Sequence, residues 1–271
     1  MKRQWYASPY ALWMLMFTIV PLLFVVYYAF TGADGRFTMA NFQRITQPGY
    51  LPVLLTSLKL AFYCTLVCLL VGYPTAYFLA SRDFSQNKML VVLILLPMWM
   101  NFLLRTYAMM TILENNGLLN TLLEKLGLDK VKLIGTEGAV LLGMVYNFLP
   151  FMVFPIYTLL SKMDYRLTEA AADLGCNSWQ TLWKVTMPLS IPGIVSGITM
   201  VFMPSVTTFF IPRVLGGGNT MMFGDLIEAK FLTEGNWNVG SALSLIMMVL
   251  ILISLSILRK ADPNGEGGGI A

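Results

Sequence analysis

The sequence contains no histidine and only three cysteines, at positions 64, 68 and 176. It therefore lacks the usual ligands of a transition-metal site and the cysteines of a disulfide framework. Only 12% of its residues are charged, against about 25% in a soluble globular domain. So few charges, 18 Lys and Arg with 14 Asp and Glu, cannot cover the surface of a folded chain of 30.3 kDa. This composition excludes a soluble enzyme and a disordered chain.

What the sequence does contain is apolar: 57% of its residues are hydrophobic, and its mean hydropathy is +0.69. Because a bilayer core about 30 Å thick needs about 20 apolar helical residues, these runs predict an all-α membrane protein that forms a single transmembrane domain over residues 1–271. Six transmembrane helices are expected, at about residues 10–30, 53–80, 89–113, 139–160, 191–211 and 239–258. Residues 261–271, rich in glycine, are expected to form a flexible tail.

The positive charges next to the spans indicate which way the chain crosses the membrane. Lysines and arginines divide equally between the two sides, so only their positions are informative. Lys2 and Arg3 directly precede the first span, and Arg259 and Lys260 end the last. The positive-inside rule gives such flanking charges the most weight. We therefore expect a multi-pass protein of the plasma membrane with both termini in the cytoplasm.

Most of the predicted spans contain a proline: Pro21, Pro74, Pro97, Pro150, Pro155 and Pro204. Each removes a backbone donor and bends its helix, which lipid tolerates only where neighbouring helices or a water-lined cavity satisfy the freed carbonyls. Two interpretations stay open, ordinary kinks of membrane helices or a bundle that rocks around a pathway. Gly193-x-x-x-Gly197, at the start of the fifth span, predicts a close approach of two helices.

The segment between the fourth and fifth spans, residues 161–190, is too long and too regular for a connecting loop. Thr168 is the expected N-cap of a helix that includes Glu169 and Asp173, whose carboxylates lie near its positive end. Gly175 is expected to take the left-handed conformation that ends this helix.

A second short helix is predicted to follow, capped by Asn177 or Ser178 and ended by Pro188. Trp179 and Trp183 share one apolar face by their i, i+4 spacing. The two helices form a helix–glycine–helix elbow on the predicted cytoplasmic side. In one interpretation this elbow lies flat on the membrane with its tryptophans among the headgroups; in the other it binds a partner.

The spacing within the elbow carries a family resemblance. It reads Glu169-Ala170-Ala171, then Gly175, then Val185-Thr186-Met187-Pro188. This resembles the signature of the integral-membrane subunits of bacterial ABC importers, which is E-A-A, three residues, Gly, nine residues and Ile-x-Leu-Pro. Val185 and Met187 are the two departures, and both are apolar.

The resemblance implies a type I ABC importer permease fold in a bacterial plasma membrane, with the elbow as a coupling helix that docks on a separate ATPase dimer. The residues it assigns to ATPase coupling are Glu169, Ala170, Ala171, Asp173, Gly175, Trp179 and Pro188. ATP and Mg²⁺ would bind to the ATPase, because the glycine cluster at 216–218 lacks the lysine of a phosphate-binding loop. The chain would then be a transporter subunit with no cofactor of its own, and not an enzyme.

Two further runs narrow the resemblance. Residues 97–107 contain the pattern P-x-W-x-N-x-L-x-R-x-Y, and residues 143–157 read GMVYNFLPFMVFPIY. Both are similar to the third and fourth spans of one permease of the spermidine/putrescine importers. This implies polyamine cargo, an extracellular substrate-binding protein and a second homologous permease in a heterodimer, with no nucleic acid as partner. Import permeases for phosphate, sulfate, molybdate or ferric iron share the elbow and stay open as the alternative, followed by a secondary transporter.

Polar and aromatic residues toward the outer half of the spans are candidates for the cargo pathway: Trp99, Asn101, Tyr107, Asp225 and Glu228. A protonated polyamine binds carboxylates and aromatic faces. Trp99 and Tyr107 fit a membrane-interface aromatic belt as well, and the two acids fit a plain surface helix over residues 221–232.

Three residues inside the predicted spans call for a structural explanation. Arg105 would repel a polycation, so we expect it in a salt bridge, to Glu114 or across the permease dimer. Cys64 and Cys68 share a face of the second span with no further metal ligand nearby, and we expect them to pack between helices.

Overall fold

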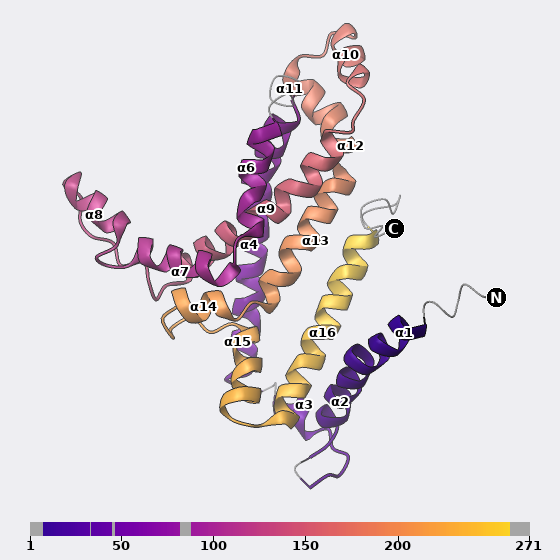
Figure 1. The fold of residues 1–271 in the computed structure, drawn as a ribbon, viewed down its shortest axis with the longest axis vertical. Helices are drawn as coiled ribbons and strands as arrows, with labels where there is room; N and C mark the ends of the chain where they lie inside the picture. The colour runs from indigo at the N-terminus through magenta and orange to yellow at the C-terminus, as the bar shows by residue number, and fades with distance from the viewer. Residues whose placement is uncertain (1–7, 33, 45–46, 82–87, 261–271) are drawn as a thin grey trace.

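The computed structural model describes residues 8–32, 34–44, 47–81 and 88–260. The expected flexible tail at 261–271 and the flanking Lys2 and Arg3 lie outside the described residues. The described chain is almost entirely helical (Figure 1).

The α-helices follow one another in this order: α1 (Ser8–Met14), α2 (Val20–Ala29), α3 (Ala40–Gln43), α4 (Tyr50–Ala80), α6 (Lys88–Trp99), α7 (Phe102–Leu113), α8 (Leu118–Lys125), α9 (Glu137–Leu160), α10 (Arg166–Asp173), α11 (Ser178–Thr181), α12 (Met187–Leu189), α13 (Ile191–Thr207), α14 (Phe210–Leu215), α15 (Phe223–Glu228) and α16 (Trp237–Lys260). Within these described ranges, π-helical turns follow α1, α11 and α15, at Leu15–Ile19, Leu182–Thr186 and Ala229–Thr233. Four helical stretches are long and apolar enough to cross a membrane: Leu12–Ala29, Tyr50–Ala80, Glu137–Leu160 and Trp237–Leu258. Two bent helix pairs raise the number of spans in the described chain to six if each pair counts as one.

The core of the bundle lies between α4, α9 and α13, which pack against one another. Glycines allow this close packing: a Cβ added at Gly193 would lie 3.2 Å from the carbonyl oxygen of Pro155, and one added at Gly197 would lie 2.7 Å from the Met152 sulfur. The predicted close approach at Gly193-x-x-x-Gly197 is therefore confirmed, and α9 is the helix it faces. Cys64 and Cys68, on α4, are fully buried in this core, as expected of packing residues.

The first and last spans form a pair of their own. Helix α2 packs along α16, which runs beside α13, whereas α1 leads away from both toward the N-terminus (Figure 1). Asn238 at the start of α16 ties the pair together, since its side-chain amide donates to the backbone carbonyls of Tyr28 (3.2 Å) and Thr31. Apolar side chains cover the outside of α1 and α2, which is the surface expected of helices that face lipid.

The third span is not continuous, contrary to the prediction of one helix over 89–113. Helix α6 ends at Trp99 and α7 begins at Phe102. The stretch Val91–Trp99 meets the following stretch Phe102–Lys125, which includes α7 and α8, at 101°. Pro97 lies in the last turn of α6, where it removes a backbone donor. Asn101 then starts the new helix, because its side-chain oxygen accepts a hydrogen bond from Leu103 N at 2.8 Å. A proline and a cap four residues apart, Pro97 and Asn101, thus replace one long helix by two short ones.

The fifth span also ends early. The prediction placed its end at residue 211, but α13 ends at Thr207 and Thr208 is extended, with ψ at 139°. Pro204 lies in the last turn of α13. A separate short helix, α14, follows from Phe210.

The elbow differs from its prediction at both ends. Helix α10 begins at Arg166, two residues before Thr168, because the Asp164 carboxylate accepts a hydrogen bond from Arg166 N at 3.0 Å. Thr168 is therefore not the N-cap; its hydroxyl donates to the Tyr165 carbonyl at 2.7 Å. Pro188 does not end the second helix either, because the first turn of α12 accepts a proline and the chain stays helical to Leu189. A 66° bend then leads into α13.

Candidate coupling and pathway sites

The two helices of the elbow are held at a fixed turn. Gly175 has φ +82°, which confirms the predicted left-handed end of α10. Asn177 caps α11, with its side-chain oxygen accepting from Gln180 N (2.8 Å) while the Gln180 side chain accepts from Asn177 N (3.0 Å). This reciprocal capping box satisfies two otherwise free backbone donors. Of the two expected caps, the structure has Asn177.

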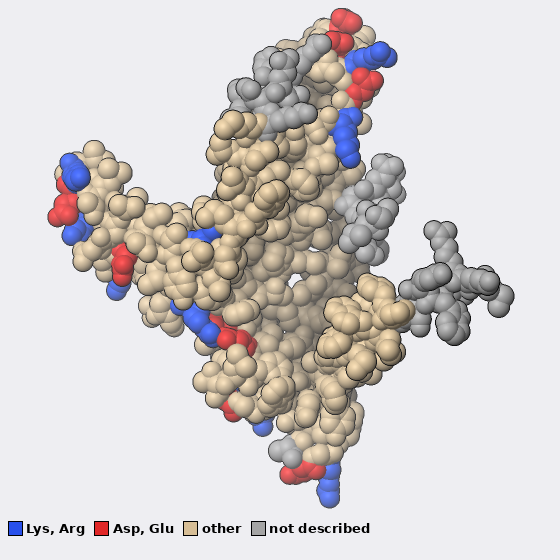
Figure 2. All heavy atoms as spheres, viewed as in Figure 1, with Lys and Arg blue, Asp and Glu red and all other residues tan. Residues whose placement is uncertain are grey.

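The elbow presents its coupling candidates to the outside. Glu169, Ala170, Asp173, Gly175, Trp179 and Pro188 are exposed, and Ala171 is buried. Leu174, beside the turn, is 86% exposed, which is unusual for a leucine. Trp179 and Trp183 pack edge to face, with ring centroids 5.6 Å apart. The elbow stands at one end of the molecule, beyond the core helices (Figure 1), and charged side chains gather there on the face drawn in Figure 2.

Open space separates the elbow from the bundle. A cavity of about 640 Å³ lies between the ends of α4 and α9 and the elbow, lined among others by Tyr77, Ser161 and Glu169. The Thr186 hydroxyl, 1% exposed, also lines it and has no hydrogen-bond partner. Helix α10 packs on α11 and on the π-helical turn at Leu182–Thr186, and the cavity leaves it room to move relative to the core.

At the other end of the core, the breaks of the third and fifth spans meet. Helix α7 packs beside α14, where the ring of Phe210 lies 5.6 Å from that of Tyr107 and 6.1 Å from that of Phe102. Trp99, at the end of α6, is 90% exposed. The structure thus places Trp99, Asn101 and Tyr107 around one break in the membrane-spanning helices. The side-chain oxygen of Asn101 already accepts the hydrogen bond that caps α7.

Asp225 and Glu228 are not free carboxylates. Arg213 on α14 donates to Asp225 Oδ1 (3.2 Å) and to Glu228 Oε1 (2.9 Å), and its Nη2 also contacts Glu228 Oε2. We call these three residues the Arg213 clasp. It joins α14 to α15 across the glycine turn at 216–218. No periodic pattern in the sequence predicts this contact, because Arg213 lies outside the helix that carries the two acids.

The charges of the Arg213 clasp are coupled. Burial raises the pKa of Asp225, whose side chain is only 12% exposed, and the guanidinium of Arg213 opposes that rise without cancelling it. The hydrogen bond to Glu228 raises the pKa of Arg213 in turn. Arg213 therefore offsets part of the cost of burying the Asp225 carboxylate between two short helices.

Two further polar contacts fix this end of the bundle. The Ser57 hydroxyl on α4 accepts a hydrogen bond from Phe223 N at 2.6 Å, which holds the start of α15. Lys59, the basic residue predicted inside the second span, pairs with Glu137 at the start of α9 (2.7 Å), and both side chains are half exposed.

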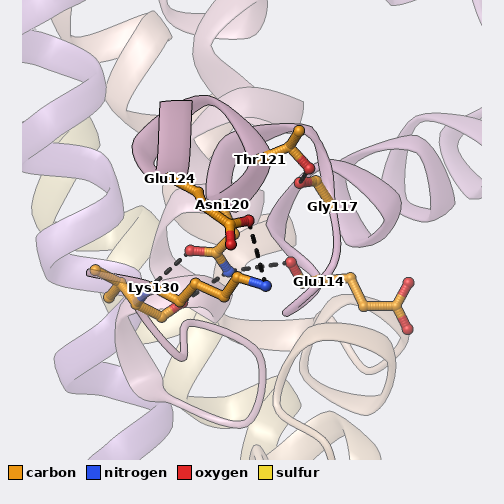
Figure 3. A network of polar contacts seen from close by, with 7 residues as sticks. Glu114, Gly117, Asn120, Thr121, Glu124 and Lys130 are labelled. Carbon is orange, nitrogen blue, oxygen red and sulfur yellow. Dashed lines mark hydrogen bonds and ion pairs between the residues drawn. The ribbon is translucent and has the colours of Figure 1, made fainter. Parts of the chain in front are cut away.

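Helices α7 and α8 form an arm that projects away from the core (Figure 1). Asn120, fully buried, holds the arm in shape: its side chain donates to the carbonyls of Glu114 (3.2 Å) and Val131 (3.0 Å) and accepts from Val131 N (2.9 Å). Figure 3 shows this network, with the Glu124–Lys130 ion pair (3.5 Å) beside it.

The prediction of a salt bridge between Arg105 and Glu114 is wrong. Both residues are described, and neither forms an ion pair with the other. Arg105 instead donates from Nη1 to the Asn147 backbone carbonyl at 3.5 Å. The cap at Asn101 turns α7, and with it Arg105, toward α9. Within the described ranges, no cluster of three His, Cys, Asp or Glu side chains could hold a metal ion.

Comparison with known proteins identifies the family. Residues 72–264 match the model of the binding-protein-dependent transport system inner membrane component. The spermidine/putrescine transport system permease protein PotB of Haemophilus influenzae is 35% identical over 258 residues, which cover 92% of this chain and 90% of that protein. PotB of Escherichia coli is also 35% identical over 258 residues, with 92% of this chain and 94% of that protein covered.

Solved structures support the fold. A bacterial ABC transporter that imports the acidic polysaccharide alginate superposes with a TM-score of 0.78 at 19% identity, over 96% of both chains. The alginate transporter in complex with its pentasaccharide-bound periplasmic protein gives 0.80 at 17% identity, over 99% of this chain and 98% of that one. The inward-facing methionine transporter MetNI superposes with a TM-score of 0.60 at 16% identity, over 78% of this chain and 95% of that one. The chain thus has the fold of ABC importer permeases, and it belongs to the family of inner membrane components of binding-protein-dependent transport systems.

Proposed function

We propose that this chain forms half of the translocation pathway for polyamines in an ATP-driven importer. The observation that carries the proposal is the likeness to the two PotB proteins, which runs over 92% of the chain and so includes the elbow and both broken spans. A second, homologous permease would complete the pathway, an extracellular binding protein would deliver the cargo, and an ATPase dimer would bind ATP and Mg²⁺.

The elbow is the proposed contact with the ATPase. Leu174 and Trp179 are exposed apolar side chains on a capped, rigid turn, which suits insertion into a cleft, and Glu169 and Asp173 add carboxylates for basic partners. The elbow continues into α13 through a helical stretch and one 66° bend, with no loop between them. A displacement of the elbow by the ATPase would therefore turn α13, whose far end carries α14 and the Arg213 clasp.

The proposed orientation places the elbow and both chain termini in the cytoplasm. The start of α1 and the end of α16 both point toward the elbow's side of the bundle (Figure 1). This arrangement agrees with the positive charges at Lys2, Arg3, Arg259 and Lys260. The arm and the Arg213 clasp then lie toward the outside of the cell.

The break between α6 and α7 is the proposed place where cargo meets this chain. Discontinuous helices mark binding sites in many transporters, because they offer polar backbone groups inside the membrane. Here the exposed rings of Trp99 and Tyr107 offer faces to an ammonium group, at about 0.5–2 kcal/mol each. Asn101 positions the break. Asp225 and Glu228 contribute by holding the outer helices through Arg213, and they reach cargo only when the Arg213 clasp opens.

Reconstitution tests the proposal directly. The chain would be assembled in proteoliposomes with its ATPase, its second permease and its binding protein, and uptake of labelled spermidine would be measured with and without ATP. We expect uptake that needs ATP and that excess putrescine suppresses while phosphate does not. ATP-driven uptake of phosphate, sulfate or ferric iron in place of spermidine would refute the polyamine assignment, and uptake by the chain alone would refute the importer.

A further inference from the structure

Arg105 is a buried cation without a counter-charge. It lies in the first turns of α7, within a membrane-spanning helix pair, and is only 4% exposed. Its hydrogen bond to the Asn147 carbonyl is long, at 3.5 Å, and its Nε has no partner. No carboxylate of the described chain pairs with it.

The neighbouring helix leaves a polar atom unsatisfied as well. Asn147 on α9 is fully buried, and its amide nitrogen donates to the Gly143 carbonyl (2.9 Å) and to the Thr106 hydroxyl (3.4 Å). These bonds fix the amide orientation and leave Oδ1 without a donor. A buried charge with unfilled hydrogen bonds is costly in a membrane, so an anion from elsewhere would stabilise this place strongly.

Four other basic residues of the described chain do have carboxylate partners. The ion pairs are Lys59–Glu137 (2.7 Å), Lys130–Glu124 (3.5 Å), Arg213–Asp225 (3.2 Å) and Lys230–Glu234 (2.6 Å). None of these cations is as buried as Arg105, which is the one Lys or Arg classed as buried where the structure gives burial. The described chain thus supplies carboxylates to four more exposed cations and none to the buried Arg105.

The surface beside Arg105 is uncovered and apolar. Its chain neighbour Leu104 is exposed, as are Trp99 and Tyr107, and the arm that carries Leu104 and Tyr107 projects beyond the bundle (Figure 1). Lipid tails would cover such a surface but carry no charge to neutralise a guanidinium. A cationic cargo would be repelled. A protein partner within the membrane supplies both an apolar cover and a carboxylate held in a fixed position.

We propose that the second permease subunit contributes an acidic side chain that pairs with Arg105 when the two permeases assemble. The inference rests on the heterodimer of the proposed function. A guanidinium pairs with a carboxylate through two parallel hydrogen bonds, which fixes orientation as well as charge. The pair would lie beside the break between α6 and α7 and would set how the two halves of the pathway meet.

The test compares the isolated chain with the heterodimer. Arg105→Met replaces an unpaired buried charge by an apolar side chain of similar length, so we expect the isolated chain in detergent to unfold at the same or a higher temperature. The affinity for the second permease should fall about thirtyfold or more, because the partner's carboxylate is then buried alone. Arg105→Lys should recover part of that loss. Lys59→Met is the matched control, because Lys59 pairs with Glu137 of the same chain, and it should leave the affinity for the second permease unchanged.

Two results would overturn the proposal. An Arg105→Met chain that unfolds at a lower temperature but binds the second permease normally would assign Arg105 to the fold of its own chain. Normal stability with normal affinity would show that nothing pairs with it. If the wild-type chain formed no heterodimer at all, the proposed assembly would fail first, and this outcome is distinct from both. A carboxylate on the second permease whose neutralisation is non-additive with Arg105→Met would identify the partner residue.

Discussion

Gly175 offers a direct test of the elbow as a lever, because its substitution changes backbone conformation and little else. Its φ of +82° is one that side chains rarely adopt, and a Cβ added there would meet no atom within 4 Å. Gly175→Val therefore introduces conformational strain without a clash. The left-handed conformation costs a residue with a Cβ about 1–2 kcal/mol, and more for a β-branched one.

This strain would be relieved by a change in the angle between α10 and α11. A cost of about 1–2 kcal/mol corresponds to a factor of about 5–30 in the population of the native turn. If the ATPase grips only that geometry, ATP-dependent uptake should fall by a similar factor. Uptake and ATP hydrolysis would be measured in the same proteoliposomes, so that a change in their ratio separates lost coupling from lost assembly.

Gly127 provides the matched control. It also has a left-handed backbone, with φ +75°, and open space around the position of a Cβ, but it follows α8 at the tip of the arm. Gly127→Val introduces the same kind of strain far from the elbow and should leave unchanged the ratio of cargo imported to ATP hydrolysed. If Gly175→Val and Gly127→Val behave alike, the elbow does not transmit force through its turn, and the coupling argument is wrong.

Further expectations concern the other end of the bundle and the core. Asn101→Ala removes the cap of α7 and should destabilise the chain by about 1 kcal/mol in thermal unfolding. Trp99→Ala should instead leave the Tm unchanged and raise the spermidine concentration needed for half-maximal uptake. If both variants changed uptake equally and neither changed the Tm, the role of Asn101 as a cap would be contradicted. Gly197→Leu forces a side chain into the α9–α13 contact and should cost about 1–3 kcal/mol, seen as a lower Tm. Arg213→Gln removes the charge that lowers the raised pKa of Asp225, so the folded chain should hold that proton at higher pH than the unfolded chain does. Its stability should then fall as pH rises through this pKa, and its Tm deficit against wild type should shrink as the pH is lowered toward the ordinary Asp pKa of about 4. A deficit independent of pH would refute the argument.

The fold could be predicted to the extent that it follows from apolar run length and local caps. The run at 53–80 and the turn at Gly175 are of this kind, because hydrophobicity and backbone freedom are properties of single residues. The broken third span could not be predicted in this way. Hydropathy is blind to Asn101 acting as a cap, since one amide among apolar residues changes a window average very little.

The site was predicted unevenly for the same reason. Asp225 and Glu228 were found by type and spacing, but their common partner, Arg213, comes from a different helix and becomes a neighbour only through the glycine turn. For Arg105 the predicted partner was wrong: Glu114 has the opposite charge and is near in sequence, but the bend at Asn101 directs the guanidinium to α9. Pairing across helices depends on bends that single residues create.

The π-helical turn at Leu182–Thr186 lies between α11 and α12, on the route from the elbow to α13. Such a turn holds one residue more than an α-helical turn, and each residue advances an α-helix by about 100°. It therefore sets the angular phase between the Trp179 face and the helix that follows. Deleting one residue from this turn would keep every side chain of α10 and α11 but would rotate these helices relative to α13. The direction of the applied torque therefore depends on the number of residues in the turn and not on their types.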